Sequence, residues 1–575
     1  MNSQIRRGGI DWSWPCALAV IWAISIFFFT PLLTLFPALI IPSYFPDAFE
    51  FIWTSWRLEG VLDGTKQLYT SQDIYAPDGA SLLLHTISEG ILLPVTALFA
   101  HESPVWRFNI SIIAVFLANG ATSLSLFRAL GCTAVSAAMC SLLVTFAPFM
   151  INHIAAGHIN LLALFPLFEA LRGMIVFSGL TRSPDALFSL NAFRYFMAIP
   201  LLILTNLYYL YFYALLCGLM IVSQIAFRRQ LTRAMVYTVG IFIAGLVPLS
   251  PHLLAIARLA LSKTYTPDHN AGLHSADLAA YLAPSTSQVA YGLPWAQYLR
   301  AGISLHEVES SLYVSFSLLA LALLSCFQTE RHLRQLSRCF LFVSALFCLL
   351  SLGPNIKWMS SVVCINPLDR LLRAVLPLYP SVPVRCGIIS ILSLVAAGSL
   401  CISKVNPARI RALGLLFLGC AIIESAPMPL KTYPVRQSSA VLEALALDHE
   451  ARIVLDFART PQFSMLRQTI HHKPIVGGYL SRRPKASEAA LRKNSFLRML
   501  RRGKLSDSRT IQEAWCALSA DRLLLEQPVA TETVETLLAL GFIRTDADDW
   551  VVLFAPSTAL CQQPKSRQES RNLIG

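Results

Sequence analysis

The chain has 575 residues, of which 55% are hydrophobic and only 14% are charged, and its mean hydropathy is +0.57. Soluble domains carry about 25% charged residues, so this composition indicates a membrane protein. The net charge of +13 does not indicate nucleic-acid binding, because most basic residues before the C-terminal region lie in short loops between apolar runs, where they set membrane orientation.

Eleven apolar runs approach the ~20 residues that a membrane-spanning helix needs. The first follows Arg6 and Arg7, is too long for a signal peptide and has no A-x-A cleavage site after it, so we expect an uncleaved span. Residues 196–227 count as two spans, because an aromatic cluster at 206–213 is typical of a membrane interface. The expected spans are residues 15–37, 107–127, 132–151, 160–178, 196–208, 210–227, 234–256, 312–327, 338–353, 385–402 and 411–426.

Lysine and arginine gather in alternate loops, whereas the short connections at 152–159 and 207–210 contain neither. The positive-inside rule therefore predicts a cytoplasmic amino terminus and a carboxyl end on the outer side. Three long outer loops follow from this topology, at 42–106, 257–311 and 354–384, and we expect amphipathic interfacial helices in them.

The composition changes near Pro427, where charged residues become frequent. Residues 452–457 and 549–554 are typical of short buried strands, and residues 438–448 and 531–540 of amphipathic helices. The expected organisation is a polytopic α-helical membrane module over 1–429, a soluble α/β or α+β domain over 430–562 on the outer face, and a disordered tail over 563–575. The thirteen cysteines show no CxxC and no zinc-type spacing.

An acidic residue, Asp47, lies where the chain leaves the first expected span. A carboxylate at the edge of hydrocarbon is costly, so Asp47 is a functional candidate. Shielding from water would raise its pKa and make it a general base towards an acceptor hydroxyl or amine. Aspartate is also a preferred helix cap, and the sequence leaves both roles open. Glu50 lies three residues on, on the same face of the expected helix.

Further polar residues fall on the same predicted side of the membrane. They are Arg57, His85, His158, Asn160, Asp277, Glu309 and Arg385. Each of these residues could instead be an interfacial anchor or a helix cap. The evidence for a site is that all of them lie on the same predicted side of the membrane. Arginine suits a phosphate ligand because its planar fork donates two hydrogen bonds. The sequence has no P-loop, no GxGxxG after a strand, no GxSxG and no HExxH, so ATP-driven transport and nicotinamide chemistry have no support.

Several motifs follow one another in a recognisable order. They are Phe45-Pro-Asp47, Tyr75-Ala-Pro-Asp-Gly79 with His85, Gly157-His158-Ile-Asn160, Ser275-Ala-Asp277 before Pro284, Glu309-x-x-x-Tyr313, Pro383-x-Arg385, and Gln468-Thr-Ile-His471 with Gly477-Gly478-Tyr479. In this order and topology the chain resembles bacterial polytopic glycosyltransferases of the GT-C superfold. Their distant relatives include oligosaccharyltransferase, protein O-mannosyltransferase and aminoarabinose transferase.

The resemblance implies an inverting hexosyl or pentosyl transfer from a polyprenyl-phosphate-linked sugar to a lipid, glycan or protein acceptor, on the outer face of the bacterial inner membrane. It implies that Asp47 acts as base or positions the substrates. It also implies that Arg57, Arg258 and Arg385 hold the lipid phosphate, and that the other polar residues bind donor or acceptor. Some relatives pair two adjacent acids or bind a divalent metal. Asp47 has no acidic neighbour before Glu50, so no cofactor is predicted and a metal stays an open alternative.

Two other functions are compatible with the sequence. A transporter or flippase for a lipid-linked sugar would place ionisable residues within the spans. The spans are nearly free of charge apart from Glu169 and Arg172, and no inverted repeat is visible. A non-catalytic scaffold would use the outer domain, whose Arg482-Arg483 and Arg501-Arg502 pairs could bind acidic headgroups or glycans.

Overall fold

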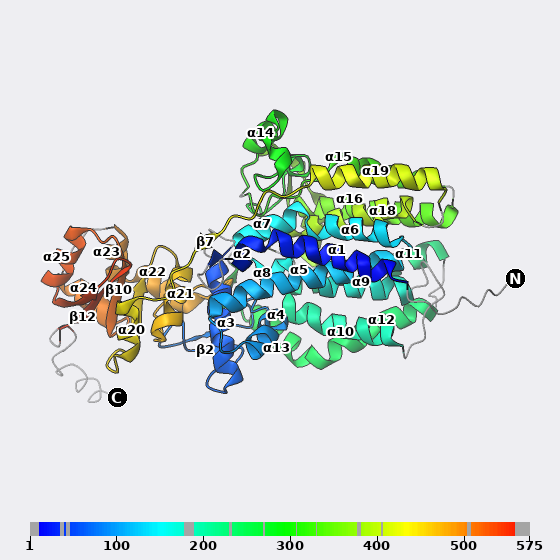
Figure 1. Ribbon diagram of the computed structural model, residues 1–575. Helices are drawn as coiled ribbons and strands as arrows, with labels where there is room; N and C mark the ends of the chain where they lie inside the picture. Colours follow the sequence, from blue (N-terminus) through cyan, green and yellow to red (C-terminus); the bar gives the residue numbers. More distant parts are fainter. Residues whose placement is uncertain are drawn as a thin grey trace.

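The computed structural model describes residues 11–34, 40–41, 47–177, 189–228, 233–267, 271–305, 307–328, 330–375, 381–403, 406–502, 508–557 and 560. The chain forms a bundle of long helices with a C-terminal α/β part at one end (Figure 1). The expected disordered tail at 563–575 lies outside the described residues, as do Phe45 and Pro46 of the motif that contains Asp47.

Each expected span coincides with one or more helices of the bundle. These helices are α1 (Ser13–Phe28), α5 (Pro104–Ala129), α6 (Ala134–Thr145), α7 (Pro148–Ala156), α8 (Ile159–Leu162), α9 (Phe165–Phe177), α10 (Leu190–Thr205), α11 (Leu207–Arg228), α12 (Arg233–Leu246), α13 (Ser250–Leu261), α15 (Phe316–Leu324), α16 (Arg331–Ser351), α18 (Gly387–Cys401) and α19 (Ala408–Glu424). Residues 196–227 divide into α10 and α11 at Asn206, whose backbone is extended with φ −163° and ψ 115°.

Within the described residues, five helical segments are long and apolar enough to cross a membrane, or six if the bent pair α6–α7 is one span. Shorter apolar helices such as α1, α10 and α15 complete the bundle. The expected membrane character is therefore confirmed, and the number of about eleven spans stays a prediction. All fifteen residues of α18 are buried. A helix that is apolar all round belongs inside a bundle, and α18 packs against α15 and α16.

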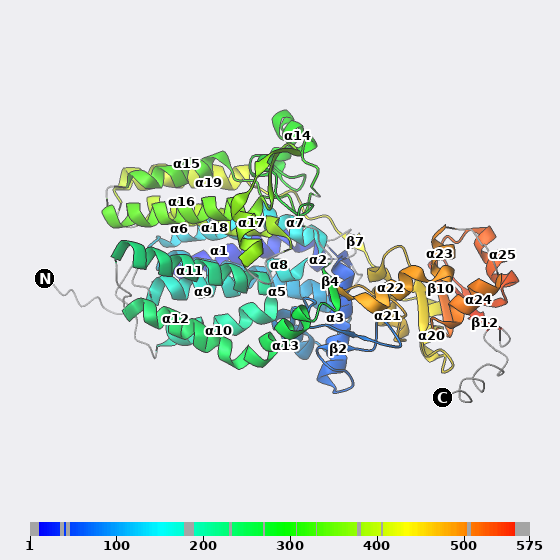
Figure 2. The ribbon, with the colours of Figure 1, turned by 180° about the vertical axis from the view of Figure 1, so that it is seen from behind.

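The long loops carry short elements at the end of the bundle that faces the C-terminal part (Figures 1 and 2). The first loop forms α3 (Asp47–Leu62), the β2–β3 hairpin (Thr70–Ser71, Ala80–Ser81) and α4 (Glu89–Leu98). The second forms β4 (Tyr265–Pro267) and α14 (Pro294–Ala301), and the third forms the β5–β6 hairpin (Asn355–Trp358, Ser361–Ile365) and α17 (Pro367–Val375). Each loop thus contains at least one helix, and the interfacial position of these helices stays a prediction.

The C-terminal part contains a four-stranded mixed sheet in the order β11-β12-β10-β8. Its strands are β8 (Val454–Phe457), β10 (Arg522–Glu526), β11 (Phe542–Ala547) and β12 (Val551–Pro556), with β8 and β10 parallel. Its helices are α20 (Ala440–Leu447), α21 (Pro461–His471), α22 (Lys485–Lys493), α23 (Ser495–Arg502), α24 (Ser508–Cys516) and α25 (Thr531–Ala539). The two strands and two helices expected from the sequence are present, and each of their ends lies within two residues of its predicted position.

Helix α21 fixes the C-terminal part against α3. The Trp53 indole donates a hydrogen bond to Gln468 Oε1 at 2.7 Å, and the Trp56 indole donates to His472 Nδ1 at 3.1 Å. Two short strand pairs add to this attachment: β1 (Ile40–Ile41) with β7 (Tyr433–Pro434), and β4 with β9 (Arg482–Pro484). These contacts hold the C-terminal part against the outer loops, at one end of the bundle.

Candidate functional site

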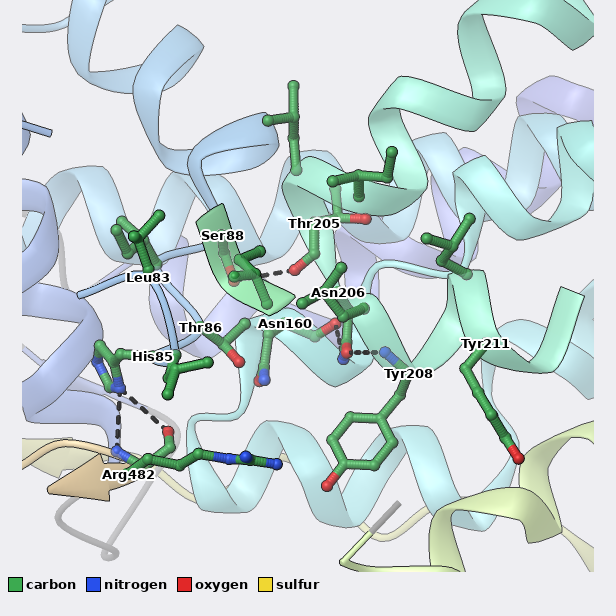
Figure 3. Close-up of a pocket in the computed structure, with 18 of the residues that line it drawn as sticks. Leu83, His85, Thr86, Ser88, Asn160, Thr205, Asn206, Tyr208, Tyr211 and Arg482 are labelled. Carbon is green, nitrogen blue, oxygen red and sulfur yellow. Dashed lines mark hydrogen bonds between the residues drawn. The ribbon is translucent and has the colours of Figure 1, made fainter. Parts of the chain in front are cut away.

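A cavity of about 930 Å³ lies where the outer loops, the bundle and the C-terminal part meet. It is lined by α3, the segment 82–89, the start of α8, the α10–α11 junction, α12–α13 and the β9 segment, and Figure 3 shows part of this lining. Among its lining residues are seven of the nine candidates from the sequence. They are Asp47, Glu50, His85, His158, Asn160, Glu309 and Arg385.

Asp47 is the first residue of α3, and its carboxylate is joined to two distant segments. His158 Nε2 lies 2.8 Å from Asp47 Oδ2, and Gln462 Nε2 of α21 donates to Oδ1 at 3.3 Å. Behind His158, the Nδ1 atoms of His153 and His158 are 2.8 Å apart. Each imidazole nitrogen donates or accepts according to the tautomer of its ring, so both contacts have hydrogen-bond geometry. The three side chains thus form one hydrogen-bonded row.

Gly157 makes this row possible. It ends α7 in the left-handed conformation with φ +76°, which a glycine adopts without steric cost. A Cβ atom at this position would lie 2.5 Å from the Ala48 Cβ, so only glycine lets the start of α3 approach the α7–α8 turn. Because Gly157 lets α3 come close, the imidazole of the next residue, His158, reaches Asp47.

The environment of Asp47 differs from the sequence expectation of a raised pKa. Burial does favour the protonated form, but the hydrogen bond and charge of His158, the amide of Gln462 and the positive field of Arg385 outweigh it. The pKa of Asp47 is lowered, and the expectation of a raised value was wrong. Asp47 is an ionised carboxylate at neutral pH, suited to orienting a hydroxyl by accepting its hydrogen bond.

Glu309 and Arg385 form a second buried pair on the cavity wall. Arg385 Nη2 lies 2.7 Å from Glu309 Oε1, and Arg385 Nε lies 3.4 Å from Oε2. Their side chains are only 11% and 10% exposed. Burial alone would raise the pKa of Glu309, but the charge and hydrogen bonds of Arg385 hold it well below its usual range. The Arg385 guanidinium also lies 5.2 Å from the centre of the Tyr208 ring.

His85 lies against the β9 segment. Its Nδ1 accepts the Ser481 backbone N–H at 3.2 Å and lies 3.0 Å from Ser481 Oγ. Burial lowers the pKa of His85 to about 4, so the ring is neutral and carries its proton on Nε2. Within the described residues this Nε2 and Asn160 Oδ1 are buried without a hydrogen-bond partner. Both groups line the cavity and are available to a ligand.

Arg57 and Asp277 lie outside the cavity lining. The Arg57 guanidinium donates to backbone carbonyls, including Leu68 at 2.9 Å, and lies 3.5 Å from Asp73. Asp277 accepts from the backbone N–H groups of Ala279, Met359 and Ser360, and so fastens the β5–β6 turn. The structure thus gives both residues a structural role in place of the expected ligand contact. Arg258, on α13, does not line the cavity either.

The sequence analysis did not identify the lining residues Tyr208 and Ser481 or the contact of Gln462 with Asp47. Tyr479 was named only within a motif and Arg482 only within a basic pair, and neither was a candidate for this site. Tyr208 belongs to the aromatic cluster that was assigned to a membrane interface. No local pattern indicates Gln462, which is 415 residues from Asp47. Within the described residues, no group of three His, Cys, Asp or Glu side chains is arranged to hold a metal ion.

Several solved structures are similar to this chain. Arabinofuranosyltransferase AftD from Mycobacteria superposes with a TM-score of 0.58 at 13% identity, over 95% of this chain and 40% of AftD. The oligosaccharyltransferase of Archaeoglobus fulgidus gives 0.47 at 9% identity over 90% and 69%, and ArnT from Cupriavidus metallidurans gives 0.40 at 12% over 96% and 98%. The chain thus spans two fifths of the length of AftD, with which it shares the GT-C fold.

No curated protein matches the sequence. One family model does match, over residues 94–423, which include the bundle from the end of α4 to α19. The chain belongs to this family, described as "Domain of unknown function (DUF6311)".

Proposed function

We propose that this chain is an integral-membrane glycosyltransferase that moves a sugar from a polyprenyl-phosphate-linked donor to an acceptor, with inversion at the anomeric carbon. The observation that carries the proposal is the Asp47 carboxylate, held by His158 and Gln462 on the wall of a large cavity in a GT-C fold. An ionised carboxylate held from two sides is preorganised to orient a nucleophile.

In the proposed reaction, an acceptor hydroxyl attacks the anomeric carbon from the face opposite the donor phosphate. The bond from the acceptor oxygen to that carbon forms as the bond from the carbon to the phosphate oxygen breaks. Asp47 orients the hydroxyl and receives its proton, and polyprenyl phosphate leaves with the bonding electron pair. The lowered pKa of Asp47 makes it a weak base, so orientation is its larger contribution.

The two ends of the cavity fit the two parts of such a donor. The end near Asp47 is polar, whereas the end between α10–α11 and α12–α13 is lined by apolar side chains. These include Ile203, Leu207, Leu210, Phe242, Leu246, Leu253 and Ile256. A lipid chain would lie at the apolar end and its sugar headgroup at the polar end.

We place the cavity on the extracytoplasmic side of the bacterial inner membrane, with the C-terminal part on the same side. The Ser13 end of α1 lies at the opposite end of the bundle from the C-terminal part (Figures 1 and 2), as the expected topology requires. Cys516 of the C-terminal part is disulfide-bonded, and disulfides persist mainly in oxidising compartments.

Comparing the glycans of a strain lacking this chain with those of the complemented strain tests the function. Mass spectrometry of lipid-linked and surface glycans should reveal one sugar missing from a surface glycan or lipid in the deletion strain, while its lipid-linked donor accumulates. In proteoliposomes, translocation of the lipid-linked sugar without any transfer product would instead identify a transporter or flippase.

A further inference from the structure

Arg482 brings a second guanidinium to the cavity, from the C-terminal part of the chain. It lies in β9, where it is opposite Pro267 of β4, and it lines the cavity. The adjacent Arg483 pairs with Glu488 at 3.4 Å and does not line the cavity. Successive side chains of a strand point to opposite faces, so one of two neighbouring arginines faces the cavity.

The two arginines of the cavity lining differ in what already holds them. Arg385 forms two contacts with Glu309, which offset its positive charge. Arg482 forms no ion pair with any carboxylate in the described part of the chain, and no hydrogen bond of its guanidinium is found there. Arg482 is therefore the cation of this lining that is available to an anionic ligand.

Unsatisfied polar groups surround the space that Arg482 enters. Its side chain extends past Asn160 towards Tyr208, as Figure 3 shows. Asn160 is 8% exposed and its Oδ1 has no hydrogen-bond partner among the described residues, and His85 Nε2 has none either. Buried polar groups are normally paired, so these atoms indicate that a polar ligand fills the space.

The position of Tyr208 indicates which part of a ligand carries the anion. Tyr208 lies on α11, next to Leu207 and near Leu210, which belong to the apolar end of the cavity. A guanidinium that reaches towards Tyr208 thus lies where the polar and apolar ends meet. In a lipid-linked sugar, the phosphate is the group between the apolar chain and the sugar.

We propose that Arg482 binds the phosphate of the lipid-linked donor, so that the C-terminal part supplies a necessary half of the donor site. The inference rests on the proposed function, because it takes the donor to be a polyprenyl phosphate. Arginine is suited to this role, since its planar fork donates two parallel hydrogen bonds to phosphate oxygens. The β4–β9 pairing fixes Arg482 to the segment that follows α13, so its position does not depend on the four-stranded sheet alone.

Binding of undecaprenyl phosphate and of uncharged undecaprenol to the detergent-solubilised full chain tests this assignment. Native mass spectrometry would compare wild type, Arg482→Gln and the matched control Arg483→Gln. We expect Arg482→Gln to weaken binding of undecaprenyl phosphate by about tenfold or more, as loss of a charge-assisted contact does, with undecaprenol binding unchanged. Arg483→Gln should bind both lipids as wild type does.

Three outcomes would contradict the account in distinguishable ways. Unchanged undecaprenyl phosphate binding by Arg482→Gln, or an equal loss in Arg483→Gln, would overturn the role of Arg482 alone. Loss of binding to methyl glucuronide, a soluble acidic sugar, with undecaprenyl phosphate binding intact would place the anion on the acceptor and overturn the donor assignment. A wild-type chain that does not prefer undecaprenyl phosphate to undecaprenol would overturn the proposed function itself.

Discussion

His158 and Asp47, which are 111 residues apart in the sequence, meet through a contact of 2.8 Å between Nε2 and Oδ2. This contact joins the turn between α7 and α8 to the start of α3. His158 supplies the largest of the influences that lower the pKa of Asp47 and so opposes the effect of burial most strongly.

Removing His158 should therefore make transfer sensitive to acid. In His158→Ala, burial is less strongly opposed, so the pKa of Asp47 rises and protonation begins at a higher pH. We expect the acid limb of the pH–rate profile to move to higher pH in the variant. His101→Ala, at an exposed position, is the control and should keep the wild-type profile. An unshifted acid limb in His158→Ala would show that the contact does not govern Asp47.

Replacing Gly157 tests the close approach of α3. Gly157→Ala adds a Cβ atom 2.5 Å from the Ala48 Cβ and also strains a backbone at φ +76°. Gly131→Ala is a matched control, because Gly131 has φ +88° but nothing within 4 Å of the added atom. Both variants should lose about 1–2 kcal/mol of stability from the left-handed backbone. Only Gly157→Ala should also lose transfer activity, and equal activity in the two variants would refute the packing argument.

The stability of the fold should fall with acid partly because of His85. Its folded pKa of about 4 lies below the unfolded value of 6.5, so the unfolded chain binds more protons between these values. Stability contributed by neutral His85 is complete above pH 6.5 and is lost as the pH falls towards 4, by up to about 1.4 kcal/mol per pH unit. The Tm of His85→Gln should decline less steeply than that of wild type over this range. Parallel declines would contradict the burial of a neutral ring.

Replacing one member of the Glu309–Arg385 pair should destabilise the fold more than replacing both members does. Glu309→Gln leaves a buried guanidinium without its counter-charge, and such a change costs about 3–5 kcal/mol. The double variant Glu309→Gln with Arg385→Met should recover part of this loss in thermal unfolding. A double variant at least as unstable as the sum of the single variants would contradict the coupling.

Local patterns were sufficient to predict much of the fold. Apolar runs located the helices of the bundle, and the aromatic cluster after Asn206 marked the break between α10 and α11. Asp47 and His158 were found because polar side chains at the end of an apolar helix are costly and therefore informative. The same argument misplaced Arg57 and Asp277, because a buried arginine or aspartate can be satisfied just as well by backbone groups.

The rest of the site depends on contacts between distant segments. Gln462 and Arg482 come from the C-terminal part of the chain. Gln462 has no local signal, and the Arg482-Arg483 pair indicates a basic surface without showing that Arg482 lines the cavity. The direction of the pKa shift of Asp47 was also predicted wrongly, because it depends on partners that lie far away in the sequence. Such properties emerge only when α21 is docked against α3.

The central claim is that the Asp47 carboxylate orients the acceptor hydroxyl in sugar transfer and receives its proton. Its most direct test is the rate of transfer from the polyprenyl-phosphate-linked donor by purified Asp47→Asn, measured beside wild type in the same membrane-mimicking detergent. Asparagine keeps the size of the side chain and its contact with His158, but it removes the negative charge and the proton acceptor. The account predicts a loss of about 100-fold or more in transfer rate, with folding and donor binding retained. Transfer at the wild-type rate by this variant would contradict it.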